Sequence, residues 1–149
     1  MRIVLVEPEI PQNTGSIARL CAATETELDL VEPLGFSLED RYLRRAGLDY
    51  WPYVRVAVHA SFAAFLEAVS PRRLLAFSSH GEASYTAVRF RPDDALVFGG
   101  ESRGLPTPLR TSLAPLYRIP MRGMGVRSLN LATAAGIVLY EGLRQLGAA

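Results

Sequence analysis

Lysine is absent from this chain of 149 residues, because all 16 of its basic residues are arginine. The absence excludes a Schiff-base lysine, the lysine of a phosphate-binding P-loop and a lysine general base. Recognition of phosphate by bidentate guanidinium groups stays available. Any phosphate contact of this protein is therefore expected to come from arginine or from backbone N–H groups.

Cysteine and histidine are scarce. Cys21 is the single cysteine, so the chain forms no internal disulfide, and its apolar helical surroundings predict a buried structural thiol. His59 and His80 are far apart in the sequence and have no neighbouring ligand residues. We therefore expect no metal site and no histidine general base.

Long hydrophobic runs are missing too. The longest, Leu129 to Tyr140, is too short to span a bilayer, and Arg2 to Val6 is too short for a signal-peptide core. A net charge of +1 predicts no broad basic face, so nucleic acid would be bound by a local cluster or by a dimer. We expect a cytoplasmic protein without membrane contact, built as one domain over residues 1–149.

Short apolar runs alternate with amphipathic segments along the chain. This alternation predicts an α/β fold with a mostly parallel sheet flanked by helices. We expect strands at residues 3–6, 28–31, 53–58, 74–77, 95–98 and 116–119. We expect helices after Pro11 with Asn13 or Thr14 as N-cap, at 40–46, after the cap Ser61, at 106–113 and at about 128–146.

Two glycine-rich turns follow predicted strands, at residues 98–106 and 119–130. Ser128 and Asn130 stand where the last helix is expected to open, so they are candidates to bind its unpaired N–H groups. Together the turns predict one pocket whose walls are largely backbone. The alternative for the first turn is a tight connection with a local ion pair between Glu101 and Arg103.

Arginine recurs at two further places. Arg41, Arg44 and Arg45 share one face of the predicted helix at 40–46 and could grip successive phosphates, although a solvated helix face is the more common meaning of such a pattern. Arg19 follows the polar turn that begins at Asn13, at the carboxyl end of a strand, where ligands bind in α/β sheets. Taken alone, that segment is better explained by a helix cap and a surface arginine.

The last predicted helix is unusually apolar. Ala132, Ala134, Ala135, Gly136 and Ile137 leave its first half almost without a polar face, which is typical of a helix buried all round. A chain of this length does not readily surround its own terminal helix. We therefore expect a homodimer.

Three segments carry a resemblance to a known family. Pro8-Glu-Ile-Pro-Gln-Asn-Thr-Gly-Ser-Ile-Ala-Arg-Leu-Cys, Phe98-Gly-Gly-Glu-Ser-Arg-Gly-Leu-Pro, and Ile119-Pro-Met through Ser128-Leu-Asn-Leu-Ala occur in this order. They resemble the motifs of the SPOUT superfamily of RNA methyltransferases. Glu32-Pro-Leu-Gly-Phe and Leu43-Arg-Arg-Ala-Gly-Leu-Asp-Tyr are similar to its tRNA (cytidine/uridine-34-2′-O)-methyltransferases. The resemblance implies a SPOUT-type α/β knot with a deep C-terminal trefoil knot, which general topology rules would have argued against.

The resemblance also implies a cofactor, a substrate and site residues. It implies S-adenosyl-L-methionine held in the knot by Phe77, Gly99, Gly104, Ile119 and Ser128. It implies 2′-O-methylation of nucleotide 34 in the tRNA anticodon stem-loop by a homodimer, with Arg41, Arg44 and Arg45 binding RNA. Other tRNA or rRNA sites, or a non-catalytic RNA-binding factor on the same fold, are the alternatives.

Catalysis by this implied site would depend on Arg19, with Asn13, Glu101, Ser128 and Asn130 shaping the same site. Two roles stay open for Arg19. It either accepts the proton of the ribose hydroxyl after a strong perturbation, or stabilises the nucleophilic oxygen and a neighbouring phosphate electrostatically. The second role fits the chemistry of a guanidinium better, since its ordinary pKa is above about 12.

Overall fold

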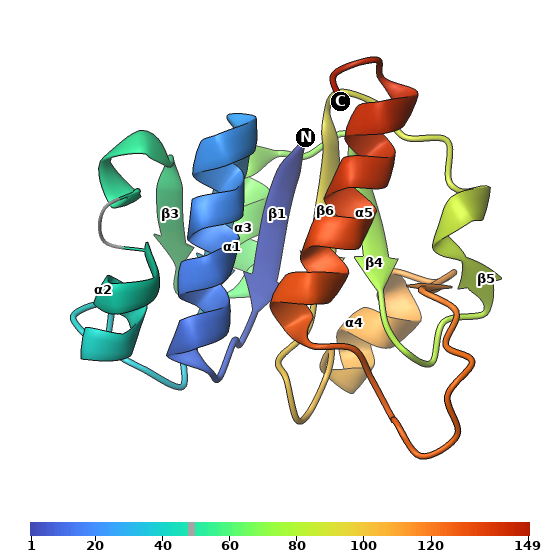
Figure 1. The fold of residues 1–149 in the computed structure, drawn as a ribbon, viewed down its shortest axis with the longest axis horizontal. Helices are drawn as coiled ribbons and strands as arrows, with labels where there is room; N and C mark the ends of the chain where they lie inside the picture. The colour runs from blue at the N-terminus through green and yellow to red at the C-terminus, as the bar shows by residue number, and fades with distance from the viewer. Residues whose placement is uncertain (48–49) are drawn as a thin grey trace.

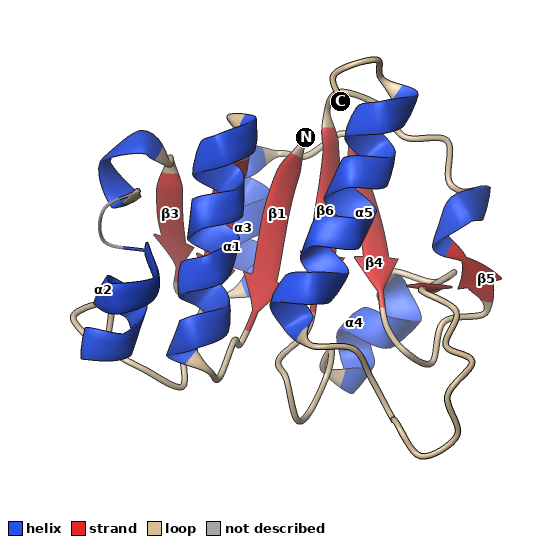
Figure 2. Cartoon of the chain, in the orientation of Figure 1, coloured by secondary structure: helices blue, strands red, loops and turns tan. Residues whose placement is uncertain are grey.

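A computed structural model of the protein describes residues 1–47 and 50–149. Leu48 and Asp49, which belong to one of the segments of family resemblance, lie outside the described residues. The described chain forms one parallel sheet with helices on both faces, as the sequence predicts (Figures 1 and 2). No helix in the described ranges is long and apolar enough to cross a membrane.

The sheet has seven strands in the order β3-β2-β1-β6-β4-β7-β5, and every recorded strand pair is parallel. The strands are β1 (Arg2–Val6), β2 (Glu27–Val31), β3 (Val56–His59), β4 (Arg73–Phe77), β5 (Ala83–Ser84), β6 (Asp94–Phe98) and β7 (Tyr117–Arg118). The helices are α1 (Pro11–Thr24), α2 (Arg41–Gly47), α3 (Phe62–Val69), α4 (Thr107–Ser112) and α5 (Leu131–Gln145), with 3-10 turns η1 (Trp51–Tyr53) and η2 (Tyr85–Ala87).

Alternate residues of the central strands face opposite sides of the sheet. In β1, Ile3 and Leu5 join the apolar cluster that includes α1 and α5, whereas Val4 and Val6 join the cluster that includes Phe65 of α3. All four are at most 2% exposed. Burying one such side chain contributes about 1.5–3 kcal/mol to stability. Burial in these two clusters therefore supplies most of the free energy that holds the helices against the sheet.

Two predicted strands are shorter than expected. The predicted strand at 53–58 begins only at Val56, because Trp51–Tyr53 form a 3-10 turn in which Tyr53 N–H donates to the Tyr50 carbonyl at 2.9 Å. The predicted strand at 116–119 is reduced to Tyr117–Arg118, which lies between β4 and β5. Both segments lie toward the ends of the sheet, where few ladder bonds are available to extend a strand.

Two predicted helix starts also need correction. α1 begins at Pro11, so the prediction of an Asn13 or Thr14 cap was wrong; proline lacks an N–H group and has a fixed φ suited to this first position. α5 begins at Leu131 with Asn130 as N-cap, whose side chain accepts from Thr133 N–H at 3.2 Å, while Ser128 precedes the helix. The predicted cap Ser61 is confirmed, accepting from Ala64 N–H at 3.0 Å.

Within this chain α5 is buried on one side only, so the predicted burial all round would need a second chain. Ala135, Val138 and Leu139 are buried against the sheet and α1, but Tyr140 is 48% exposed and Ile137 is half-buried. The sheet and α1 cover only the inner side of α5, and its outer side has no further layer of the described chain over it. The homodimer and the trefoil knot both stay predictions.

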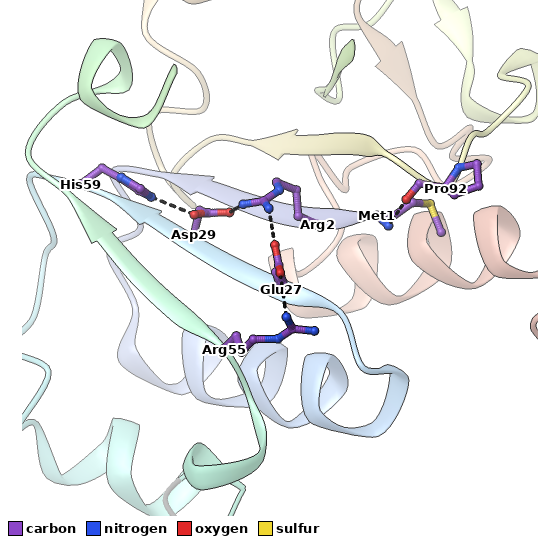
Figure 3. Close-up of polar contacts among 7 residues, drawn as sticks. All are labelled: Met1, Arg2, Glu27, Asp29, Arg55, His59 and Pro92. Carbon is purple, nitrogen blue, oxygen red and sulfur yellow. Dashed lines mark hydrogen bonds and ion pairs between the residues drawn. The ribbon is translucent and has the colours of Figure 1, made fainter. Parts of the chain in front are cut away.

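A network of charged and polar side chains links β1, β2 and β3, and it includes His59, one of the two histidines (Figure 3). Asp29 is 2% exposed and bonds both Arg2 Nη1 and His59 Nε2, each at 2.8 Å. Arg2 also pairs with Glu27, which lies 3.2 Å from Arg55 Nη1. His59 is therefore a structural residue of the sheet, far from the strand ends described next.

Candidate active site

Three parallel strands end together at one side of a cavity. Register pairs Phe77 of β4 with Phe98 of β6 and with Tyr117 of β7, so the turns that follow these strands leave the sheet side by side. The cavity has a volume of about 1010 Å³. Ligands bind at the carboxyl ends of strands in such sheets, and the cavity lies where the two glycine-rich turns were predicted to meet.

Aromatic rings form the inner wall of this cavity. The Phe77 and Phe98 rings stack with centroids 5.3 Å apart and planes at 20°, and Tyr117 lies 6.0 Å from Phe77. Leu105 and Leu131 add aliphatic surface to the lining. An apolar wall edged by backbone donors and acceptors suits a flat heterocycle such as adenine, which needs no charged partner.

Glycine is required in the turn at 99–104 because the backbone folds tightly on itself. Gly104 N–H donates to the Gly100 carbonyl at 2.9 Å, and Gly104 has a φ of +65°, a conformation that favours glycine. A Cβ on Gly99 would lie 2.2 Å from the Gly104 carbonyl carbon. The turn therefore places bare backbone at the edge of the cavity.

Glu101 projects from this turn toward the start of α1. Its carboxylate accepts from Glu9 N–H at 2.7 Å, from Ile10 N–H at 3.1 Å and from Asn13 Nδ2 at 3.2 Å. The described residues include no ion pair between Glu101 and Arg103, which was the alternative explanation of the turn. Glu101 thus satisfies the N–H groups of the two residues that immediately precede α1.

Asn13 connects Glu101 to the last helix. Its Oδ1 accepts from Asn130 Nδ2 at 2.9 Å, while the Asn130 Oδ1 caps α5. Asn13 is 8% exposed, so the amide is held in one orientation. Three residues predicted for one site, from three distant segments, are therefore joined in a single hydrogen-bonded row at the cavity.

The structure separates the predicted site residues into two groups. The cavity is lined by all five predicted cofactor residues and by three of the four predicted catalytic residues: Phe77, Gly99, Gly104, Ile119, Ser128, Asn13, Glu101 and Asn130. Arg19 is exposed and outside the lining, with its guanidinium carbon 4.8 Å from the centre of the Tyr50 ring. Arg41, Arg44 and Arg45 are exposed on α2, beside α1 and also outside the lining.

Glu9 is a residue of this region that the sequence prediction did not single out. Its carboxylate accepts from Ser102 Oγ at 2.5 Å, from Ser102 N–H at 3.2 Å and from Arg103 N–H at 3.4 Å. The Ser102 hydroxyl and then the two backbone N–H groups hold the pKa of Glu9 below its ordinary value. Its signal was its place between a strand end and a helix start, within the first segment of family resemblance.

Cys21 takes no part in the site. It is buried on the inner face of α1, and this burial raises the pKa of its thiol to about 12, which makes it unreactive. Among residues 1–47 and 50–149 no group of three or more His, Cys, Asp and Glu side chains could hold a metal ion.

Comparison with known proteins gives matches over nearly the whole chain. The tRNA (cytidine(34)-2′-O)-methyltransferase of Methylovorus glucosotrophus (strain SIP3-4) is 49% identical over 144 residues, 96% of this chain and 94% of that protein. The protein of the same description from Escherichia coli (strain K12) is 48% identical over 149 residues, 99% of this chain and 94% of that protein.

Comparison with solved structures also gives matches over nearly the whole chain. One that concerns the 2-OH methylation of C/U34 on tRNA is 53% identical, with a TM-score of 0.91 over 99% of this chain and 97% of that chain. The SpoU methyltransferase AviRb of Streptomyces viridochromogenes, in complex with the cofactor AdoMet, is 25% identical, with a TM-score of 0.89 over 100% of this chain and 61% of that chain. The SpoU rRNA Methylase family matches residues 1–140, and the chain belongs to this family.

Proposed function

We propose that this protein transfers a methyl group from S-adenosyl-L-methionine to the ribose 2′-hydroxyl of nucleotide 34 of tRNA. The observation that carries the proposal is the near full-length identity of 48–49% to enzymes named for this reaction. The cavity supports it, since eight residues expected for cofactor and catalysis line one space. Modification of tRNA also accords with a cytoplasmic location.

The cavity suits this cofactor in its lining residues and its volume. Phe77 supplies an aromatic wall, Gly99 and Gly104 bring backbone close, and Ile119 and Ser128 approach from the second turn. Its volume lies at the upper end of the range of about 300–1000 Å³ usual for small-molecule sites. Bound S-adenosyl-L-methionine would supply an electrophilic methyl group on a sulfonium sulfur.

The row formed by Glu101, Asn13 and Asn130 orients the site rather than removing a proton. Both carboxylate oxygens of Glu101 already accept hydrogen bonds from N–H donors. Each oxygen of the two asparagine amides likewise has a donor, so their roles in the row are satisfied. We infer that the row fixes the wall against which the ribose is placed, which is a positional contribution to the rate.

Arg19 is proposed to stabilise negative charge that develops on the attacking oxygen. A guanidinium has only donors, which suits this role and not proton acceptance. Arg19 follows Asn13 by six residues, about 9 Å along the helix axis, and does not line the cavity of its own chain. A second copy of α1 would be needed to bring this side chain to a cavity.

A homodimer is therefore part of the proposal. α1 and α5 pack side by side; Ile10, the N-cap of α1, is 42% exposed, Tyr140 of α5 is 48% exposed, and Gly136 and Ile137 of α5 are half-buried. Small and apolar residues on an outer helix surface are typical of a subunit contact. We propose that this surface joins two copies and that Arg19 of each copy serves the cavity of the other.

The exposed arginines of α2 are proposed to bind the anticodon stem-loop. Leu43 is 2% exposed and anchors α2 to the body of the protein, which turns Arg44 and Arg45 outward. Arg41 lies over the Tyr42 ring, 4.8 Å from its centre, and Tyr42 itself is 39% exposed. Guanidinium groups beside an exposed aromatic ring suit phosphates and an unstacked base.

The test is incubation of the protein with methyl-labelled S-adenosyl-L-methionine and total tRNA, followed by mapping of methylated riboses. We expect label at nucleotide 34 only. Label at another position, or in rRNA, would make this a 2′-O-methyltransferase with a different substrate. Cofactor binding without any transfer would support a non-catalytic RNA-binding factor instead.

A further inference from the structure

Two carboxylates cross between the start of α1 and the glycine turn at 99–104. Glu101 reaches from the turn to the backbone N–H groups of Glu9 and Ile10. Glu9 reaches in the opposite direction, to the hydroxyl and N–H of Ser102 and to the N–H of Arg103. Each segment therefore supplies the acceptor for N–H donors of the other.

The two segments also touch directly. A Cβ on Gly100 would lie 2.6 Å from the Glu7 carbonyl oxygen and 2.8 Å from Glu9 Oε1, distances that a side chain cannot occupy. Glu7 has a φ of 53°, which turns the chain as it leaves β1. Close contact and reciprocal hydrogen bonds thus act on the same few residues.

The Glu9 side chain is chemically suited to hold the turn. A carboxylate is acceptor-only and offers several lone pairs, so it can satisfy three converging donors at once. Glutamine at this position offers a single acceptor oxygen and two N–H donors that would face donors of the turn. The carboxylate is consequently the functional group that this geometry selects.

We propose that Glu9 is a positioning residue, which fixes the 99–104 turn against α1 and thereby sets both the cofactor wall and the row formed by Glu101, Asn13 and Asn130. The proposal deepens the proposed function and its catalytic consequences rest on it. Gly99 and Gly104 line the cavity from the same turn that Glu9 holds. Loss of the hydrogen bonds to the Glu9 carboxylate loosens those to the Glu101 carboxylate, because both sets join the 99–104 turn to the start of α1.

The first experiment measures amide hydrogen exchange by NMR in the wild type, Glu9→Gln, Ser102→Ala and the control Glu67→Gln. Glu67 is exposed on α3, on the opposite face of the sheet, and the control makes the same chemical change. We expect Glu9→Gln to speed exchange of the Ser102, Arg103 and Ile10 amides by about tenfold, the equivalent of one charge-assisted hydrogen bond. Ser102→Ala should act in the same direction and less strongly.

The response of Ile10 decides the matter, because Ile10 N–H bonds Glu101 and not Glu9. Unchanged exchange at Ile10 in Glu9→Gln, alongside faster exchange at Ser102, would overturn the coupling. If Glu9→Gln fails to fold, the same comparison is made in Ser102→Ala, which leaves the carboxylate in place. No change at Ile10 in that variant would also overturn it.

The second experiment measures the cofactor Kd by calorimetry and steady-state kinetics at a temperature well below unfolding. We expect Glu9→Gln to raise the cofactor Kd and lower kcat while KM for tRNA stays within twofold. The double variant with Ser102→Ala should be no worse than Glu9→Gln alone, since the two side chains act through one contact. A purely structural role would lower Tm and leave both Kd and kcat at wild-type values, contradicting the proposal.

The two proposals fail in distinguishable ways. A wild-type protein that binds no S-adenosyl-L-methionine would refute the proposed function, and the exchange pattern would still confirm or refute that Glu9 fixes the 99–104 turn against α1. A wild type that methylates tRNA, with exchange and Kd in Glu9→Gln equal to those of Glu67→Gln, would refute only the role of Glu9.

Discussion

The cavity at the carboxyl edge of the sheet and the arginine surface on α1 and α2 are built in different ways. The cavity uses backbone, aromatic rings and amides locked to one another, all within one chain. The arginine surface consists of Arg19, Arg41, Arg44 and Arg45, whose charged groups are exposed. Under the proposed function, the cofactor side would be complete in the monomer, whereas the RNA side would depend on a second chain and on the substrate.

The strongest test of this contrast is Arg19→Ala. We expect kcat to fall by at least ~100-fold, since the loss of one donor to a developing oxyanion has this effect, while the cofactor Kd is unchanged. Arg55→Ala, which removes an 80% exposed arginine just before β3, is the control. Loss of calorimetric cofactor binding in Arg19→Ala would show that Arg19 belongs to the cavity side and would refute the division.

Tyr140→Arg should separate the two sides by breaking the dimer. A charge in the middle of the proposed α5 contact would be buried without a partner, so we expect a monomer in analytical ultracentrifugation and at least tenfold lower turnover. Cofactor binding should persist. Leu66→Arg on α3, 37% exposed on the other face, is the control that should stay dimeric. A dimeric Tyr140→Arg protein would place the interface elsewhere.

Neutralising Arg41, Arg44 and Arg45 together should act on RNA alone. We expect a higher KM for tRNA and a shallower salt dependence, with the slope of log K against log salt reduced by roughly 2 to 3. The matched control neutralises Arg72, Arg89 and Arg91, three exposed arginines near the opposite edge of the sheet. Equal effects of the two triple variants would mean that overall charge, and not α2, governs RNA binding.

Asn130→Ala has the smallest expected effect and sharpens the comparison on the cavity side. Loss of the α5 cap should cost about 1 kcal/mol, or roughly 3 °C in Tm, and loss of the Asn13 contact should lower kcat as well. Ser61→Ala removes the matched cap of α3 and should cost similar stability without affecting kcat. If kcat were equal in Asn130→Ala and Ser61→Ala, the row formed by Glu101, Asn13 and Asn130 would have no catalytic role.

Prediction from the sequence succeeded where local pattern and burial agree. The runs in β1, β2, β4 and β6 were correctly assigned, because central parallel strands are apolar on both faces. It overextended short peripheral strands such as β7, and it was wrong at the start of α1, where Pro11 begins the helix without a side-chain cap and a distant carboxylate binds the N–H groups just before it. Such contacts cannot be foreseen from neighbours in sequence.

The sequence by itself determined the helix and strand order, the two glycine turns and the set of residues that the family resemblance marks for cofactor and catalysis. Only the tertiary structure decided which of those residues meet. It brought Asn13, Glu101 and Asn130 into one hydrogen-bonded row, left Arg19 outside the cavity, and revealed Glu9 opposite Ser102. The reason is physical: hydrogen bonds between residues about 90 to 120 positions apart depend on how parallel strands align, and a one-dimensional pattern carries no record of that alignment.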